Sequence, residues 1–259
     1  MNKLLLNMIL MFFPVIILSQ GRAIAQKVEM RRVSSGVYEP FFKNENLKKI
    51  QVDAFLLGET AVTNADYLAF VKANPEWRRS NVSSLLADKN YLKHWESDLK
   101  IGNDELYNAP VVYVSWFAAR AYCEWQGGRL PTTAEWEFAA EGAPLGEQIE
   151  NLTKFAMKWN AEPRPDILPA VKSTYQNEYG LYDMNGLIWE WTFDFNNIVQ
   201  SAKGKNGVTR VEFTCGAGAL DVSNPDDYPA YLRYGLRSSL KGNYCISTLG
   251  FRCAAHLKK

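Results

Sequence analysis

Apolar side chains recur at helical spacing in three segments before residue 143, and each segment follows a residue that caps helices well. Thr63 and Asp66 form a capping-box pair ahead of the first segment. Ser115 precedes the second, and Thr132 with Glu135 forms a capping box before the third. The apolar positions of the first two are Tyr67, Leu68, Phe70 and Val71, then Ala118, Ala121, Tyr122 and Trp125. The pattern therefore predicts three short helices.

Glycines mark the expected ends of two of these helices, at Gly127-Gly128 and at Gly142. Beyond residue 143 the helical period fades, and Asn, Gly, Pro and Asp recur between short aromatic or β-branched runs such as Val208–Phe213. That pattern is typical of short strands joined by long loops. The chain contains neither repeats nor a low-complexity linker, so we expect one loop-rich α+β domain.

The first 25 residues have the pattern of a secretory signal. Lys3 is followed by an apolar run from Leu4 to Leu18, and Ala23-Ile24-Ala25 is a small-x-small cleavage site. We therefore expect a signal peptide over 1–25, a mature domain over 26–259, and a periplasmic or secreted protein without a stable membrane anchor. An uncleaved anchor is the alternative interpretation.

The net charge bears on the kind of partner, and the cysteine count bears on disulfides. Removing residues 1–25 takes away Lys3 and Arg22 but no acidic residue, so the formal charge changes from +1 to −1. A near-neutral chain without a basic run gives no electrostatic reason to bind nucleic acid or an anionic membrane. Four cysteines in an oxidising compartment favour disulfides, and four cysteines allow three pairings.

Five sequence blocks, in order, carry a family resemblance. They are AVTNADY at 61–67, PVVYVSW at 110–116, GRLPTTAEWEFAA at 128–140, GLYDMNGLIWEWT at 180–192 and LGFRCA at 249–254. Together they resemble the formylglycine-generating enzyme (sulfatase-modifying factor) family, a variant of the C-type-lectin-like fold. The resemblance implies an α+β fold of short helices and loop-rich antiparallel strands. The segment 77–95 looks like a periplasmic subgroup that includes proteins associated with nitrite reductase and with pyoverdine chromophore maturation.

The resemblance also implies roles for the cysteines. Cys123 and Cys253 match the disulfide pair of secreted family members. The family binds copper(I) through two other cysteines, a soft metal on soft ligands. Counting back from Gly250 places the family's arginine at Arg237 but puts those two cysteine positions at Asn224 and Pro229. We therefore do not expect the standard reaction.

Cys215 and Cys245 remain after that assignment. They form a second structural disulfide, a redox pair or a thiolate metal site, with copper as the candidate metal. Cys215 precedes the turn Gly216-Ala217-Gly218, where the family carries its catalytic thiols. Cys215 and Arg237 are thus the candidate catalytic residues, and Trp189 and Arg233 are the candidate binding residues beside them.

Calcium is the second candidate metal, because the family binds it around the fourth block. This chain has Leu187 where the family has an asparagine ligand, and Lys172 where it has an aspartate. The remaining candidate oxygen donors are Asn160, Asp183, Asn185 and Glu190. In the alternative interpretation, Trp189 and Trp191 are core rings and Glu190 is a hydrogen-bonded acid. The three-histidine iron site of other relatives is excluded, because the chain has only two histidines.

These observations lead to one hypothesis and one alternative. The hypothesis is an exported maturation factor of oxidoreductase type that acts on another exported protein or peptide without the two-cysteine copper site. The alternative is a non-catalytic binding or scaffold module on the same fold. A two-thiol metal or redox site favours the first, and a locked Cys215–Cys245 disulfide favours the second.

Overall fold

The computed structural model describes residues 28–43, 49–146, 149, 151–196, 221–222 and 227–257. The described helices are α1 (Asn64–Ala73), α2 (Trp116–Trp125), α3 (Thr133–Ala140), α4 (Leu152–Ala161) and α5 (Tyr228–Ser239), with 3₁₀ turns η1 (Pro75–Trp77) and η2 (Asp104–Leu106). The described strands are β1 (Met30–Val33), β2 (Gly36–Tyr38), β3 (Phe42–Lys43), β4 (Ile50–Val52), β5 (Phe55–Gly58), β6 (Trp189–Glu190), β7 (Asp221–Val222), β8 (Leu249–Gly250) and β9 (Ala254–His256).

The three helices predicted from apolar spacing are confirmed, with the predicted caps. The Thr63 and Thr132 side chains cap α1 and α3, and each forms a full capping box with the acid three residues later. The Ser115 hydroxyl accepts the Ala118 N–H at the start of α2. Capping satisfies backbone donors that have no partner inside the helix, so these residues set where the helices begin.

The expectation of only strands and loops beyond residue 143 is wrong for two segments, α4 and α5. Asn151 caps α4, and its side chain accepts the Lys154 N–H. Asp227 caps α5 by accepting the Ala230 N–H. These two helices pack together, and α5 buries a mixed face that includes arginines rather than an apolar stripe. The Val208–Phe213 run lies outside the described residues.

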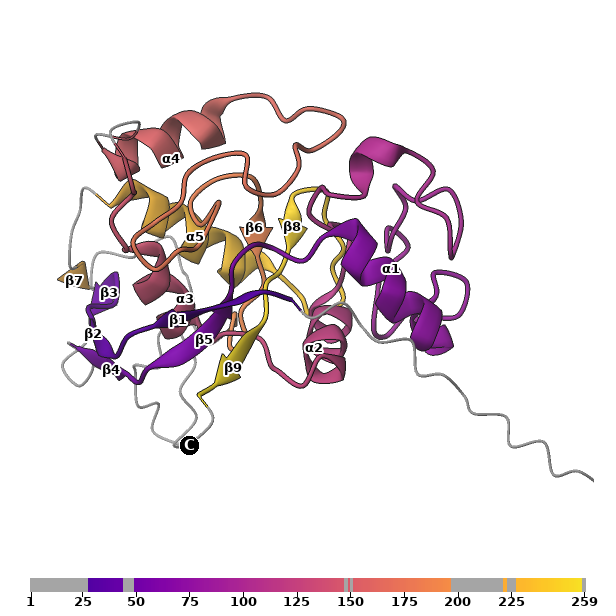
Figure 1. The fold of residues 1–259 in the computed structure, drawn as a ribbon, viewed down its shortest axis with the longest axis horizontal. Coiled ribbons are helices and arrows are strands. Elements are labelled where there is room, and N and C mark those ends of the chain that lie inside the picture. The colour runs from indigo at the N-terminus through magenta and orange to yellow at the C-terminus, as the bar shows by residue number, and fades with distance from the viewer. Residues whose placement is uncertain are drawn as a thin grey trace, which may run out of the picture.

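A three-stranded antiparallel sheet joins distant parts of the sequence. Its order is β1-β5-β9, and Leu57 in the central strand pairs with Arg31 on one side and Ala254 on the other. The smaller pairs β2–β4 and β3–β7 are also antiparallel, whereas β6 and β8 pair in parallel. Figure 1 shows α1 and α2 on one side of the β6–β8 pair, with α4 and α5 on the other.

The core consists of separate clusters of buried apolar side chains. One cluster, under α1 and α2, is rich in rings, and Tyr67, Tyr122 and Phe251 pack edge to face or stacked within it. A second cluster packs Trp136 of α3 against Leu57 of the sheet. Among the described residues, none of the helices combines the length and apolar character that a membrane span requires.

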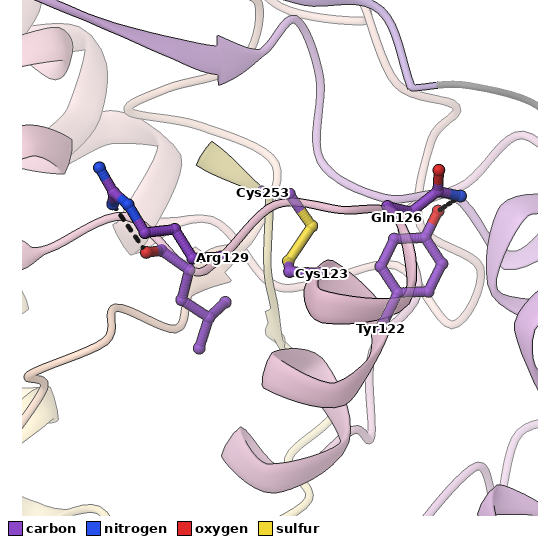
Figure 2. Close-up of a disulfide and its surroundings, with 6 residues drawn as sticks. Tyr122, Cys123, Gln126, Arg129 and Cys253 are labelled. Atoms are coloured by element: carbon purple, nitrogen blue, oxygen red, sulfur yellow. Dashed lines mark hydrogen bonds between the residues drawn. A yellow bond between two sulfur atoms is a disulfide. The ribbon is translucent and has the colours of Figure 1, made fainter. Parts of the chain in front are cut away.

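A disulfide links α2 to the segment between β8 and β9. Cys123 and Cys253 are bonded, with 5.4 Å between their Cα atoms and 130 residues between them in sequence. Figure 2 shows the bond bridging the end of α2 to the returning chain. Both residues are buried. This is the pair that the family resemblance implies.

Candidate functional site

A narrow cavity lies where α4, α5 and β6 meet. Its free volume is about 30 Å³, enough for one or two water-sized groups. It brings together six of the residues singled out from the sequence as candidate binding, catalytic or oxygen-donor residues, which are Asn160, Asn185, Trp189, Glu190, Arg233 and Arg237. Trp136, Trp159 and Arg164 also line it, and sequence reasoning missed all three. We call this space the first cavity.

Two arginines of α5 anchor one wall of the first cavity through a single carboxylate. Arg233 donates from Nε and Nη2 to Glu137, with the shortest contact at 2.7 Å, and Arg237 donates from Nη1 to the other oxygen of the same carboxylate. Arg233 also donates from Nη1 to Asn185 Oδ1 at 2.9 Å. All three charged side chains are buried. Because Arg233 and Arg237 lie four residues apart, one turn of α5 presents both to Glu137.

Electrostatics keep Glu137 charged in this setting. Burial alone raises the pKa of its carboxyl group, but the charges and hydrogen bonds of Arg233 and Arg237 outweigh burial and hold the pKa below its usual value. Both guanidinium groups also lie over the Trp136 ring, at 5.4 Å and 5.3 Å from its centroid. The two arginines are therefore fixed in position by acid and ring together.

A second buried ion pair lies beside the first. Arg252 forms a two-pronged contact with Glu190, Nε to Oε2 at 2.7 Å and Nη2 to Oε1 at 2.8 Å. The Trp136 indole N–H donates to Glu190 Oε2 at 2.8 Å, so this tryptophan connects the two networks. Trp191 is fully buried, whereas Trp189 is half-buried and lines the cavity. The sequence interpretation of Glu190 as a hydrogen-bonded acid agrees with these contacts.

The oxygen atoms proposed for calcium are occupied by protein donors. Asp183 accepts the backbone N–H groups of Lys172 at 2.6 Å and Thr174 at 2.9 Å. Glu190 is neutralised by Arg252, and Asn185 Oδ1 accepts from Arg233. Asn160 Oδ1 accepts from Arg164 at 3.2 Å. Among the described residues, no group of three or more His, Cys, Asp or Glu side chains is placed to hold a metal. These side-chain oxygens therefore do not fit calcium, which takes six to eight oxygen ligands, several of them charged.

We therefore expect that chelation leaves the fold unchanged. Adding excess EDTA to the purified protein should not lower its melting temperature, because the buried cations Arg252, Arg233 and Arg237 already neutralise the acids of this region. Differential scanning calorimetry with and without EDTA, then with added CaCl₂, measures this. A melting temperature that falls on chelation and recovers with calcium would contradict the assignment.

Similarity to known proteins shows the family of this chain. The family described as sulfatase-modifying factor enzyme 1-like domain matches residues 18–257. The chain belongs to this family. A formylglycine-generating enzyme of Streptomyces coelicolor is 32% identical over 251 residues, with 79% of each chain covered. The family and the α+β fold predicted from the five blocks are confirmed.

A second relative and a solved structure extend the comparison. A bovine protein named inactive C-alpha-formylglycine-generating enzyme 2 is 36% identical over 168 residues, which are 60% of this chain and 52% of the bovine one. The chain thus spans about half the length of that relative. The solved structure of PvdO from Pseudomonas aeruginosa has a TM-score of 0.52 at 19% identity and covers 88% of this chain and 94% of its own. That likeness shows the shared fold.

The cysteines of this sulfatase-modifying-factor-like chain do not form a paired-thiolate site among the described residues. Cys245 is buried and free, and burial, with the nearby Asp88 charge, raises the pKa of its thiol to about 12. A protonated thiol is a poor nucleophile and a poor copper ligand. Pro229 lies buried in the first turn of α5, and Cys215 and Asn224 lie outside the described residues. The suggested pairing of Cys215 with Cys245 therefore stays a prediction.

Proposed function

We propose that this chain is an exported maturation factor that binds a side chain of another exported polypeptide in the first cavity, without the family's two-cysteine copper site. The observation that carries the proposal is the convergence of Trp189, Arg233 and Arg237 on one cavity. Its apolar and aromatic lining suits burial of part of a side chain, and its polar groups are already fixed by Glu137 and Asn185.

Charge narrows the kind of side chain that fits. Arg164, Arg233 and Arg237 line the cavity, and Glu137 offsets one of these three charges. Glu190 also lines it but is neutralised by Arg252. The surplus is positive, so an acidic or electron-rich side chain is favoured and a basic one is disfavoured.

The standard sulfatase reaction should not occur. Incubation with a Cys-x-Pro-x-Arg peptide and copper(I) should yield no formylglycine by mass spectrometry, since the described residues hold one free thiol, Cys245, and it is buried. The basic residue of that peptide also meets the positive surplus of the cavity. The Streptomyces relative serves as the positive control. Efficient conversion by this chain would refute the prediction and place the thiol pair in residues outside those described.

Peptide selection tests the binding proposal directly. Random peptides displayed on phage would be selected on the wild-type protein and counter-selected on L236W, in which a large ring fills the first cavity from α5. Leu236 is half-buried, lines the cavity and belongs to neither buried ion pair. Acidic peptides that bind the wild type and lose affinity for L236W are expected. Equal binding to both proteins, or no enrichment, would overturn the proposal.

The non-catalytic binding module remains the second candidate, and Cys245 favours it. Cys245 does not line the first cavity, and a thiol held protonated in the core is inert. The carboxylate that lines the cavity, Glu190, is paired with Arg252. Metal content together with a free-thiol count on the folded protein separates the two functions. Bound copper or a reactive thiol pair supports maturation chemistry, whereas a metal-free protein with no reactive thiol supports the binding module.

A further inference from the structure

A larger cavity lies next to the first one and is not used by the proposed function. Its free volume is about 250 Å³, and its lining includes His94, Tyr113, Arg164, Leu168 and Thr248. Arg164 also lines the first cavity, so this residue borders both cavities. Drug-sized ligands occupy roughly 300–1,000 Å³, so this second cavity suits a smaller molecule or the end of a chain.

Arg164 differs from the arginines of the neighbouring networks. Arg233, Arg237 and Arg252 each contact a carboxylate. Among the described residues, Arg164 instead contacts the Asn160 amide oxygen at 3.2 Å and the Trp159 ring at 5.3 Å, and no carboxylate. Burial lowers the pKa of its guanidinium group. A half-buried cation in this state gains most from an anionic partner, because charge-assisted hydrogen bonds to carboxylates are strong and directional.

His94 and Tyr113 give the second cavity an aromatic and uncharged wall. Their rings lie 5.5 Å apart and tilted by 32°. Asn64 fixes the histidine tautomer, because its amide N–H₂ donates to backbone carbonyls and its oxygen must accept from His94 Nε2 at 2.9 Å. Burial, with the Arg79 charge, lowers the pKa of His94 to about 4, so the ring is neutral near pH 7. Tyr113 is held with φ at +56°, and its N–H donates to Ile246.

Polar groups at the remaining edge are available to a ligand. The hydroxyl of Thr248 has no protein partner among the residues described, and neither has that of Ser247, an exposed residue of the lining. Lys93 adds positive charge near the wall, with its Nζ 4.8 Å from the Tyr113 ring. One acid, Asp166, lies exposed at the rim. The second cavity thus combines an apolar and aromatic body with one unpaired cation and two free hydroxyl groups.

We propose that the second cavity binds a carboxylate attached to a short apolar body, with Arg164 as the anion-binding residue and the Tyr113 wall as the surface for the body. The carboxylate belongs either to a small acylated acid or to the C-terminus of a polypeptide. This site goes beyond the proposed function, because it uses a different cavity and a different recognised group.

Matched ligand pairs test the proposal. N-acetyl-L-leucine and its amide, N-acetyl-L-leucinamide, differ in the carboxylate alone, and isothermal titration calorimetry measures both. The acid should bind about tenfold more tightly than the amide, as expected for one charge-assisted contact. The longer acid acetyl-Ala-Ala-Leu distinguishes the sources. Comparable affinity points to polypeptide C-termini, and loss of binding points to small free acids.

Protein variants locate the site. R164Q should remove the preference for the acid, R164K should keep part of it, and R32Q, which changes an exposed arginine on β1, should leave it intact. S247W places a large ring at an exposed position of the second cavity's lining and should abolish binding of both leucine compounds. This result does not depend on whether R164Q folds. L236W, which fills only the first cavity, should retain acid binding, so failure of the two sites can be told apart. An acid preference that survives R164Q, or acid binding that survives S247W, would overturn the proposal.

Discussion

Replacing Glu137 with glutamine should destabilise the protein by about 3–5 kcal/mol, the usual cost of removing one partner from a buried ion pair. Glu137 is 2% exposed and is the shared acid of Arg233 and Arg237. Glutamine keeps the shape but leaves two buried guanidinium groups without a counter-charge. Urea unfolding followed by tryptophan fluorescence measures the loss, and the slope with urea concentration should stay unchanged.

The matched control is E124Q. Glu124 forms an exposed pair with Arg120 at 2.7 Å, and exposed pairs contribute about 0–1 kcal/mol. If E137Q loses no more unfolding free energy than E124Q, then Glu137 does not stabilise the fold through its buried ion pairs with Arg233 and Arg237. Binding of the selected acidic peptides to E137Q tests the site as well, because a displaced α5 should lower binding in the first cavity.

Lowering the pH should reduce the difference in unfolding free energy between wild type and E137Q. The pKa of Glu137 is lower in the folded protein than in the unfolded chain, so its contribution is present above the unfolded pKa, near 4.3, and is lost as pH falls through the folded value. The stability difference measured at pH 7 should therefore be preserved down to about pH 5 and shrink below it. A stability difference that grows as the pH falls would contradict a lowered pKa for Glu137 in the folded protein.

Removing the Cys123–Cys253 bond should produce a loss of similar size. The bond closes a loop of 130 residues, and the chain-entropy model assigns such a crosslink about 4–5 kcal/mol through its effect on the unfolded chain. The double variant C123A/C253A should unfold at lower urea than wild type by that amount. Reducing the wild type with dithiothreitol in urea should bring it close to the double variant.

Peptide mapping provides the independent check. Digestion of the wild-type protein without reductant should yield a Cys123–Cys253 crosslinked peptide. Detection of Cys123 as a free thiol, or paired with Cys215, would refute the assignment even if the double variant proved unstable, since replacing two buried side chains has its own cost.

Local signals identified the helices that begin with strong caps. Thr63 with Asp66 and Thr132 with Glu135 are short-range patterns, and both capping boxes form. α5 was missed although Asp227 ahead of Tyr228-Pro229 is also a helix start. Its buried face carries Arg233 and Arg237, so the apolar period that reveals most helices is broken by charges. The paired arginines make sense only once Glu137, about a hundred residues earlier in the sequence, is known to face them.

Some members of the site could be predicted from the sequence, but its geometry could not. Trp189 lies in a family block, Arg237 follows by counting back from Gly250, and Arg233 was a candidate beside them; the three residues do converge. From the sequence, Glu137 looks like an ordinary polar residue of a helix and Arg164 looks like a cation in a loop. The ion pairs of Glu137 and the cavities beside Arg164 are formed with residues distant in sequence, which no local pattern reveals. Two like charges four residues apart on one helix are a usable signal, since burying both requires a shared acid.

The central position of β5 has a consequence for how the protein is made. β5 lies early in the chain, but its partner β9 and the cysteine that pairs with Cys123 are among the last residues described. A ribosome releases the chain from its N-terminus, so β5 must wait for nearly the whole domain to be synthesised before its second edge is covered. During that interval Phe55 and Leu57 belong to an open edge that other nascent chains can pair with. Premature termination before β9 should therefore yield aggregates rather than a smaller folded domain, and holdase chaperones should engage this chain until its last strand appears.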